Sequence, residues 1–159
     1  MSPAELIAAL EAADAPSREL DAEAIFNLYA KPVGVSTIDG GPKGYLWPED
    51  NPSWNLGLRF PGKDRDWFKK VRRDPDQETI LIERDGALVL ANALRIPRLT
   101  ASIDASETLK LPEFNIEIRS FPYGYHVIVM SQNDGSMFMG KHKHEAMARD
   151  IAWLKARQQ

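Results

Sequence analysis

The sequence predicts an α+β fold, and three observations carry that prediction. Apolar residues recur at helical spacing near both ends of the chain, which indicates amphipathic helices there. Between them lie a two-residue hairpin turn and stretches in which apolar and polar residues alternate, as they do in half-buried strands. Hydrophobic residues make up 43% of the 159 residues, enough for a core, and this length fits a single domain over 1–159.

Composition excludes several chemistries. The chain has no cysteine, so disulfides, thiol catalysis, zinc–thiolate sites and iron–sulfur clusters are ruled out. Its formal net charge of -3 gives no overall attraction to nucleic acid or to anionic membranes. No signal peptide is recognisable, and no apolar run approaches the roughly 18 residues of a membrane span. We therefore expect a cytoplasmic protein with no membrane partner, for which nucleic acid is not the sole partner.

The first 29 residues predict two antiparallel helices. Ser2 and Glu5 form a capping-box pattern around Pro3, a favoured first-turn residue, and an apolar stripe follows. The chain breaks at Pro16, after which a second helical pattern continues to about Tyr29. The short connection between the two patterns favours a helical hairpin.

Residues 31–63 are rich in glycine and proline. We expect an irregular loop there, because that density opposes both a continuous helix and a central strand. The same stretch holds the aromatic residues Tyr45, Trp47, Trp54 and Phe60, which a solvated linker would not favour. The loop is therefore predicted to pack as a shaped surface.

A helix over 64–73 and a β-hairpin are predicted next. The hairpin signal is Asp85-Gly86 between two aliphatic runs, a type I′ pattern. Its register sets Leu81 opposite Leu90 and Ile82 opposite Val89, so both faces should be covered. The predicted strands are 79–84 and 87–91. The composition of 87–95 also allows a helix, and that alternative stays open.

The C-terminal third alternates between helix and strand patterns. Phe114, Ile116 and Ile118 alternate with polar residues, as expected of a half-buried strand. Turn residues separate this strand from two further ones. The predicted elements are a helical stretch over 100–109, strands over 114–119, 125–130 and 137–139, and a last helix over 143–157.

Two blocks of the sequence resemble a known family. The first runs from Ala4-Glu5-Leu6-Ile7 to Arg18-Glu19-Leu20-Asp21, and the second from Thr100-Ala101-Ser102-Ile103-Asp104-Ala105 to Leu154-Lys155-Ala156-Arg157. In wording and order they resemble the phage ABA-sandwich domain, which occurs in bacteriophage and prophage genes. The resemblance covers 1–29 and 97–157.

The resemblance implies a fold and a setting. The fold is an antiparallel sheet with helices packed on both faces (an α-β-α sandwich), with an N-terminal helical hairpin and a C-terminal helix. Residues 31–96 would then be an insertion that elaborates this framework with a helix and a β-hairpin. The implied setting is that of a phage or prophage accessory protein. The resemblance assigns no catalytic residue to this chain.

The candidates for partner binding lie in the predicted insertion. Trp47 and Trp54 flank an acidic, proline-stiffened segment, a composition typical of interfaces with aromatic anchors. The alternative, that both tryptophans pin the loop onto the core, stays open. The basic face of the 64–73 helix is a second candidate surface, against the alternative of a solvated face. The candidate residues are Trp47, Glu49, Asp50, Trp54, Arg65, Lys69, Arg72 and Arg73.

Other motifs point to structure rather than chemistry. His142 and His144 are of a type that binds zinc or nickel, but no full ligand set accompanies them, so a solvated helix start is predicted. Residues 40–44 lack the phosphate-loop pattern and predict a turn. No spacing assigns a nucleophile and a base. The sequence favours a protein without cofactor, metal or catalysis, although catalytic groups can also meet only in space.

These features favour a phage- or prophage-encoded protein that binds a host component stoichiometrically, plausibly a defence complex such as CRISPR-Cas, and inhibits it. The alternative is a protein that binds a small molecule or nucleotide, as a sponge or an unrecognised enzyme, with Trp47 or Trp54 stacking on a ring. A minor virion component is a third interpretation, and a homodimer stays open.

Overall fold

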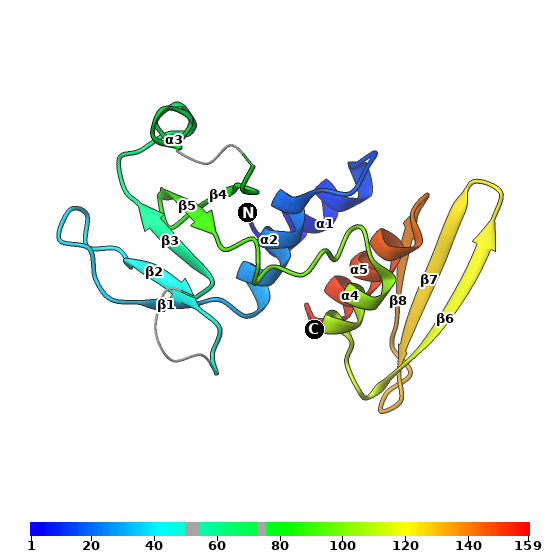
Figure 1. The fold of residues 1–159 in the computed structure, drawn as a ribbon. Helices are drawn as coiled ribbons and strands as arrows, with labels where there is room; N and C mark the ends of the chain where they lie inside the picture. The colour runs from blue at the N-terminus through cyan, green and yellow to red at the C-terminus, as the bar shows by residue number, and fades with distance from the viewer. Residues whose placement is uncertain (50–54, 73–75) are drawn as a thin grey trace. The chain divides into compact units, whose positions relative to one another are not determined.

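The computed structural model describes residues 1–49, 55–72 and 76–159, and the chain forms two compact units. Unit 1 consists of Ala22–Ile96 with Met1, and unit 2 of Ser2–Asp21 with Pro97–Gln159. One division falls inside the helix α2, Arg18–Leu28. Each unit has its own antiparallel sheet (Figure 1). The single domain over 1–159 stays a prediction.

Unit 1 contains a five-stranded antiparallel sheet in the order β1-β2-β3-β5-β4. The predicted hairpin is present: Leu81 lies opposite Leu90 and Ile82 opposite Val89. Both turn residues have the positive φ that a type I′ turn requires, 52° at Asp85 and 72° at Gly86. Residues 87–91 are thus strand rather than helix. The strands are β1 Lys31–Val33, β2 Gly44–Leu46, β3 Gly57–Phe60, β4 Ile80–Arg84 and β5 Ala87–Ala91.

One face of this sheet is buried against α2, and Gly57 permits the close contact. A Cβ atom at Gly57 would lie 2.9 Å from the Phe26 ring of α2, so no larger residue fits there without a shift. Phe26 also meets the buried Tyr45 edge-on, with ring centres 5.2 Å apart. β3 lies between β2 and β5, so the expectation that 31–63 holds no central strand is wrong. The glycine in that strand serves a helix–sheet contact rather than a turn.

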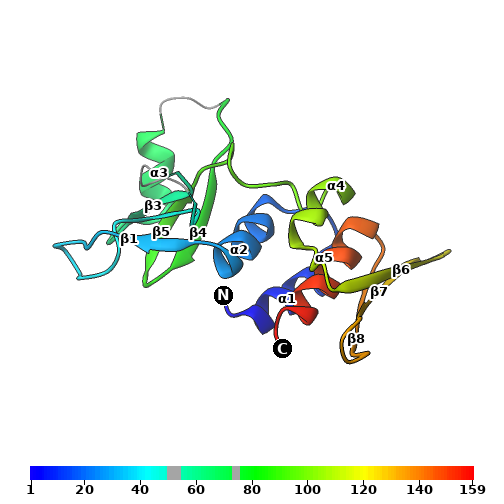
Figure 2. The ribbon, with the colours of Figure 1, turned by 90° about the horizontal axis from the view of Figure 1, so that it is seen from below.

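The opposite face of the sheet carries α3, Arg65–Val71 (Figure 2). The Asp64 carboxylate caps this helix by accepting a hydrogen bond of 2.8 Å from the main-chain N–H of Trp67. Phe60 of β3 packs edge-on against Phe68 of α3, with ring centres 5.0 Å apart. The aromatic contact holds α3 on the sheet, and the helix predicted over 64–73 is confirmed over the bounds of α3.

Unit 2 contains a three-stranded antiparallel sheet in the order β6-β7-β8, with α5 packed on one face (Figures 1 and 2). The contact is close, because a Cβ atom at Gly140 would lie 2.0 Å from the main-chain oxygen of Ala148. Trp153 of α5 is fully buried in this core. The elements are α1 Pro3–Ala12, α4 Ile103–Ser106, the 3-10 helix η1 Glu107–Leu109, β6 Phe114–Phe121, β7 Gly124–Ser131, β8 Met137–His142 and α5 Glu145–Ala156.

Local capping explains where the helices of unit 2 begin. The Ser2 hydroxyl accepts from the N–H of Glu5 at 3.2 Å, and the Glu5 carboxylate accepts from the N–H of Ser2 at 2.6 Å, so the capping box is confirmed. The helical stretch expected over 100–109 begins only after Ser102, whose hydroxyl caps α4. β8 reaches His142, three residues beyond its predicted end, and α5 starts correspondingly later.

The α+β class, with N-terminal helices and a C-terminal helix, is confirmed. The strands divide between two sheets rather than forming one. In unit 2, the face of the sheet that points away from α5 carries no helix of that unit within the described residues (Figure 2). Met130 and Met137 pair with each other on that face and are exposed. Among the described residues, no helix combines the length and apolar character needed to cross a bilayer.

A carboxyl group lies inside the core of unit 2. Asp150 of α5 is buried, and neither of its carboxyl oxygens has a hydrogen-bond partner among the described residues. The nearby Ser106 hydroxyl lies 3.2 Å from the main-chain oxygens of Leu99 and Ser102, which compete for its single proton. Burial raises the pKa of Asp150 well above its ordinary value, and the charge of Asp21 raises it further.

The Asp150→Asn variant is expected to be more stable than the wild type at pH 7, by about 1–3 kcal/mol. The folded-state pKa of Asp150 is raised, so its contribution to stability is present in acid and is lost as pH rises from about 4 towards the folded pKa. Urea unfolding at several pH values checks this. The two proteins should converge near pH 4, and a difference that does not change with pH would contradict the account.

Candidate binding groove

An open groove lies between α3 and the outer face of the sheet in unit 1. Its volume is about 1040 Å³, and its described lining comes from β3, α3, the β4–β5 hairpin and the short segments beside it. Small-molecule pockets typically enclose about 300–1,000 Å³. The groove volume lies slightly above that range, and the groove opens to solvent.

A row of three leucines forms the floor of the groove. Leu58 of β3 pairs with Leu90 of β5, which pairs in turn with Leu81 of β4. Directly paired residues of antiparallel strands share a face of the sheet, so the three side chains lie in one line. α3 covers the neighbouring row, at Phe60, but leaves this one open, and Leu58 remains 39% exposed. The floor is therefore apolar and accessible.

α3 forms one wall of the groove, with both apolar and positively charged side chains. Phe68 and Val71 line the groove with apolar surface, and Val71 is 45% exposed. Arg65, Lys69 and Arg72 line the same wall with positive charge. These residues recur every three or four positions, so they share one side of the helix. The wall is thus both apolar and cationic.

The charges that line the groove are unequal. Three cations line it, Arg65 and Lys69 of α3 and Arg72 at the C-cap of that helix, whereas Glu78 is the one carboxylate among its described lining residues. Arg65 is held across the outer strand, since its Nη2 donates to the main-chain oxygen of Leu81 at 3.1 Å. Lys69 lies 4.0 Å from Asp66, an exposed pair of little energetic weight. An anionic group with an apolar neighbour is the complementary ligand.

The structure brings together some of the predicted site residues. Arg65, Lys69 and Arg72 line one groove, whereas Trp47 and Glu49 do not line it. Trp47 is half-buried and packs on Tyr29, just after α2, with ring centres 5.5 Å apart, which favours the view that it pins the loop. The predicted residues Asp50, Trp54 and Arg73 lie outside the described residues.

The leucine floor was missed by sequence reasoning, although its signal was present. The hairpin carries large aliphatic side chains on both faces, and both faces were expected to be covered. α2 covers one face, but α3 has only 7 residues and covers the other in part. Leu58 carried no signal, because β3 was not expected as a strand.

The glycine-rich loop over 40–44 closes around an arginine. Buried Arg59 donates two hydrogen bonds to Asp39, of 2.9 and 2.5 Å, and the Asp39 carboxylate also accepts from the N–H of Gly41 at 3.0 Å. The guanidinium lowers the pKa of Asp39 to about 2. The phosphate-loop alternative therefore loses its basis, because the turn is organised around an internal ion pair.

A second buried polar contact lies beside this ion pair. The Tyr45 hydroxyl donates to the carboxylate of Asp85, and the main-chain oxygen of Asp85 accepts from Arg59. Burial and the Asp85 carboxylate raise the pKa of Tyr45 above its ordinary value. The hairpin turn is thereby tied to the loop over 40–44, and these groups stabilise unit 1 rather than forming an open site.

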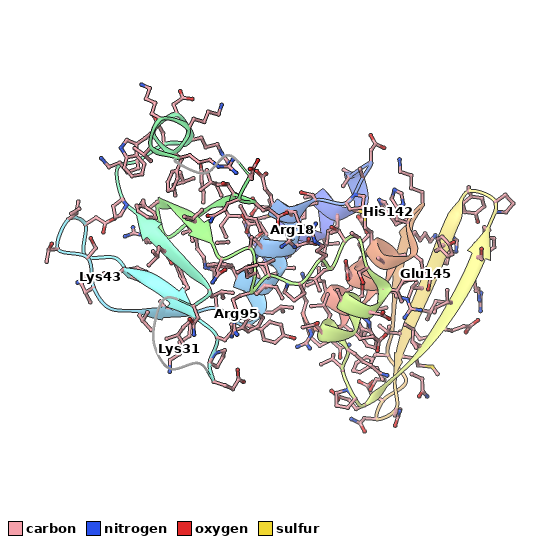
Figure 3. The ribbon with its side chains drawn as sticks, viewed as in Figure 1. Arg18, Lys31, Lys43, Arg95, His142 and Glu145 are labelled. Carbon is pink, nitrogen blue, oxygen red and sulfur yellow. The ribbon has the colours of Figure 1, made fainter. Side chains whose placement is uncertain are left out.

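The helix start predicted here is present, with His144 as the N-cap of α5, but both rings are half-buried against the chain that follows α1 rather than fully solvated. Figure 3 labels His142, at the end of β8 beside the C-terminal end of α1. His142 Nε2 lies 2.8 Å from the main-chain oxygen of Ala13, and its Nδ1 accepts from the N–H of His144 at 3.0 Å. Both ring nitrogens of His142 are therefore occupied. His144 Nε2 lies 3.2 Å from the main-chain oxygen of Asp14.

No family model, no curated protein and no solved structure matches this chain. The groove is interpreted from its own geometry and charge. Within 1–49, 55–72 and 76–159, no three His, Cys, Asp or Glu side chains gather so that they could hold a metal ion.

The His142→Ala variant is expected to lose about 1–2 kcal/mol of unfolding free energy, because the main-chain oxygen of Ala13 and the N–H of His144 each lose a partner. His144→Ala is the matched control and should lose less, since its contact is longer and more exposed. Thermal melts with and without micromolar zinc distinguish the metal alternative. A zinc-dependent rise in Tm that disappears in His142→Ala would contradict the structural role.

Proposed function

We propose that this protein works by stoichiometric binding and that the groove beside α3 receives an acidic, apolar segment of a partner protein. The observation that carries this proposal is the combination of a leucine floor and a cationic wall in one open groove. Leucine-type side chains of the partner would gain roughly 25 cal/mol per Å² of apolar surface removed from water. Its carboxylates would form charge-assisted hydrogen bonds with arginine and lysine.

The residue types that line the groove favour a protein segment over a nucleotide as its ligand. A nucleotide base needs an aromatic face or a set of hydrogen-bonding groups, and Phe68 is the one aromatic residue in the described lining. That ring is already engaged edge-on by Phe60 and by Trp67. A peptide with alternating acidic and apolar side chains needs neither, because it uses the two features that the groove offers.

The setting that we propose is the cytoplasm of a bacterial host, with the protein as a phage or prophage accessory factor. The resemblance of residues 1–29 and 97–157 to the phage ABA-sandwich domain supports this setting. A protein that works by stoichiometric binding suits an inhibitor of antiviral defence, such as CRISPR-Cas. Phage plaquing on defence-positive and defence-negative hosts tests it, since the proposal requires protection only where the defence is present.

Charge reversal at Lys69 should weaken partner binding at least about tenfold, or about 1.4 kcal/mol. The matched control is Lys70→Glu, which makes the same change on the next residue of α3, outside the groove lining. Fluorescence anisotropy with a labelled peptide of alternating Glu and Leu measures the affinity, and a Lys/Leu peptide of equal length reports nonspecific binding. Equal effects of Lys69→Glu and Lys70→Glu would contradict the groove.

Leu58→Asp tests the floor independently of charge on α3. Leu58 is partly exposed, so the variant should fold, and its circular dichroism and Tm check this. It should abolish binding of the Glu/Leu peptide and protection in the plaquing assay together. If peptide binding is lost but protection is unchanged, the groove binds acidic segments without serving the proposed anti-defence role.

A further inference from the structure

β6 is a long strand with one unpaired side. It spans 8 residues and forms an outer edge of the sheet in unit 2. Long edge strands present a row of free N–H and C=O groups that can pair with another chain, and proteins usually shorten, charge or cover them. An edge strand that is neither short nor covered is therefore a candidate for pairing with another chain.

The other outer strands are short or capped. β1 has 3 residues and contains Pro32. Arg65 donates to the outer main-chain oxygen of Leu81 in β4, and Lys155 Nζ donates to the main-chain oxygen of Met139 in β8 at 3.1 Å. No such side-chain cap meets the main chain of β6 within the part of the chain that the structure describes.

The register with β7 shows which groups of β6 point outwards. Phe121 pairs with Gly124 across a two-residue turn, and the N–H of Gln132 donates to the main-chain oxygen of Glu113 at 2.9 Å. Odd-numbered residues of β6 therefore exchange hydrogen bonds with β7. Because the pattern alternates, the N–H and C=O groups of Ile116, Ile118 and Ser120 point to the free edge.

We propose that β6 pairs with β6 of a second copy of this chain, antiparallel, about a twofold axis at Ile118. The two Ile118 residues would then form a hydrogen-bonded pair, and Ile116 would pair with Ser120 of the second copy. In this register the outward-pointing N–H and C=O groups of Ile116, Ile118 and Ser120 all have hydrogen-bond partners in the second copy. It joins the two three-stranded sheets into one sheet of six strands.

Charge complementarity favours this register over the two registers next to it. With the axis at Ile118, Glu117 lies opposite Arg119 of the second copy, and Arg119 lies opposite Glu117. These pairs are not hydrogen-bonded through the main chain, so their side chains approach most closely. An axis at Glu117 or at Arg119 would instead place like charges opposite each other. Within one copy the same two side chains already form an exposed ion pair of 2.7 Å.

Burial of exposed apolar surface supports the same axis. Ile118 is 38% exposed although its pairing with the buried Val127 places it on the face of the sheet that carries α5. Pairing at Ile118 places two such side chains side by side, removing both from water. Isoleucine pairs on neighbouring strands are favourable contacts in sheets.

Concentration-dependent sedimentation of the full chain tests the proposal through a charge cycle. Glu117→Arg should raise the dimer Kd at least about tenfold, since it sets two arginines opposite each other twice. The double variant Glu117→Arg/Arg119→Glu restores opposite charges and should recover the dimer. Lys110→Glu, an exposed charge change outside β6, is the matched control and should leave the Kd unchanged.

Cysteine pairing tests the axis itself, because the chain has no cysteine of its own. Ile118→Cys should form an intermolecular disulfide under mild oxidation, since Cα atoms of a hydrogen-bonded pair lie about 5.5 Å apart. Ile116→Cys should not, because its two copies would be separated by about 14 Å. A monomer at all concentrations, a dimer indifferent to Glu117→Arg, or equal cross-linking of the two cysteine variants would overturn the proposal.

Discussion

The contact between the Phe26 ring and the missing side chain of Gly57 is the constraint on which unit 1 depends. It lets α2 approach the sheet closely enough to bury one face, and it places β3 next to β5. That position aligns Leu58 with Leu90 and Leu81. The groove is therefore a consequence of helix packing on the opposite side of the sheet. A helix of 7 residues on the outer face then leaves the leucine row uncovered.

Two of the buried charged side chains, Arg59 and Asp150, differ in their hydrogen bonding. Arg59 is buried but meets a carboxylate and main-chain oxygens, so most of its hydrogen-bonding capacity is used in organising a loop. Asp150 is also buried, but neither of its carboxyl oxygens has a hydrogen-bond partner among the described residues. A paired charge can specify a conformation at little net cost, whereas an unpaired carboxyl stays neutral by binding a proton. Arg59 therefore stabilises the conformation of its loop, whereas Asp150 destabilises the core of unit 2.

Sequence patterns were sufficient where structure is decided locally. The capping box at Ser2 and the hairpin register around Asp85-Gly86 follow from neighbouring residues, and both are present. Patterns failed where a distant residue decides the outcome. Gly57 reads as a strand breaker until Phe26 is known to lie against it, and His142 reads as solvated until α1 is placed beside it. The division of the strands between two sheets depends on such long-range packing too.

In the candidate site, too, the sequence predicted what neighbouring residues decide and missed what distant residues decide. The basic side of α3 was visible as a helical repeat of charges, and Arg65, Lys69 and Arg72 do share one groove. The leucine row was hidden, because strand order cannot be read from one sequence when a strand is only 4 residues long. Trp47 carried a strong compositional signal for an interface, yet in the structure its ring packs on Tyr29.

Arg65 lines the groove and also closes the edge of β4, so the two properties cannot be varied separately. A ligand carboxylate that attracts its guanidinium competes with the main-chain oxygen of Leu81. Releasing that oxygen costs about 1 kcal/mol if no water replaces the bond, and this amount is subtracted from the affinity of the ligand. Occupation of the groove would then leave β4 as a more open edge. In the proposed complex, occupation of the groove and exposure of the β4 edge are in this way coupled through one side chain.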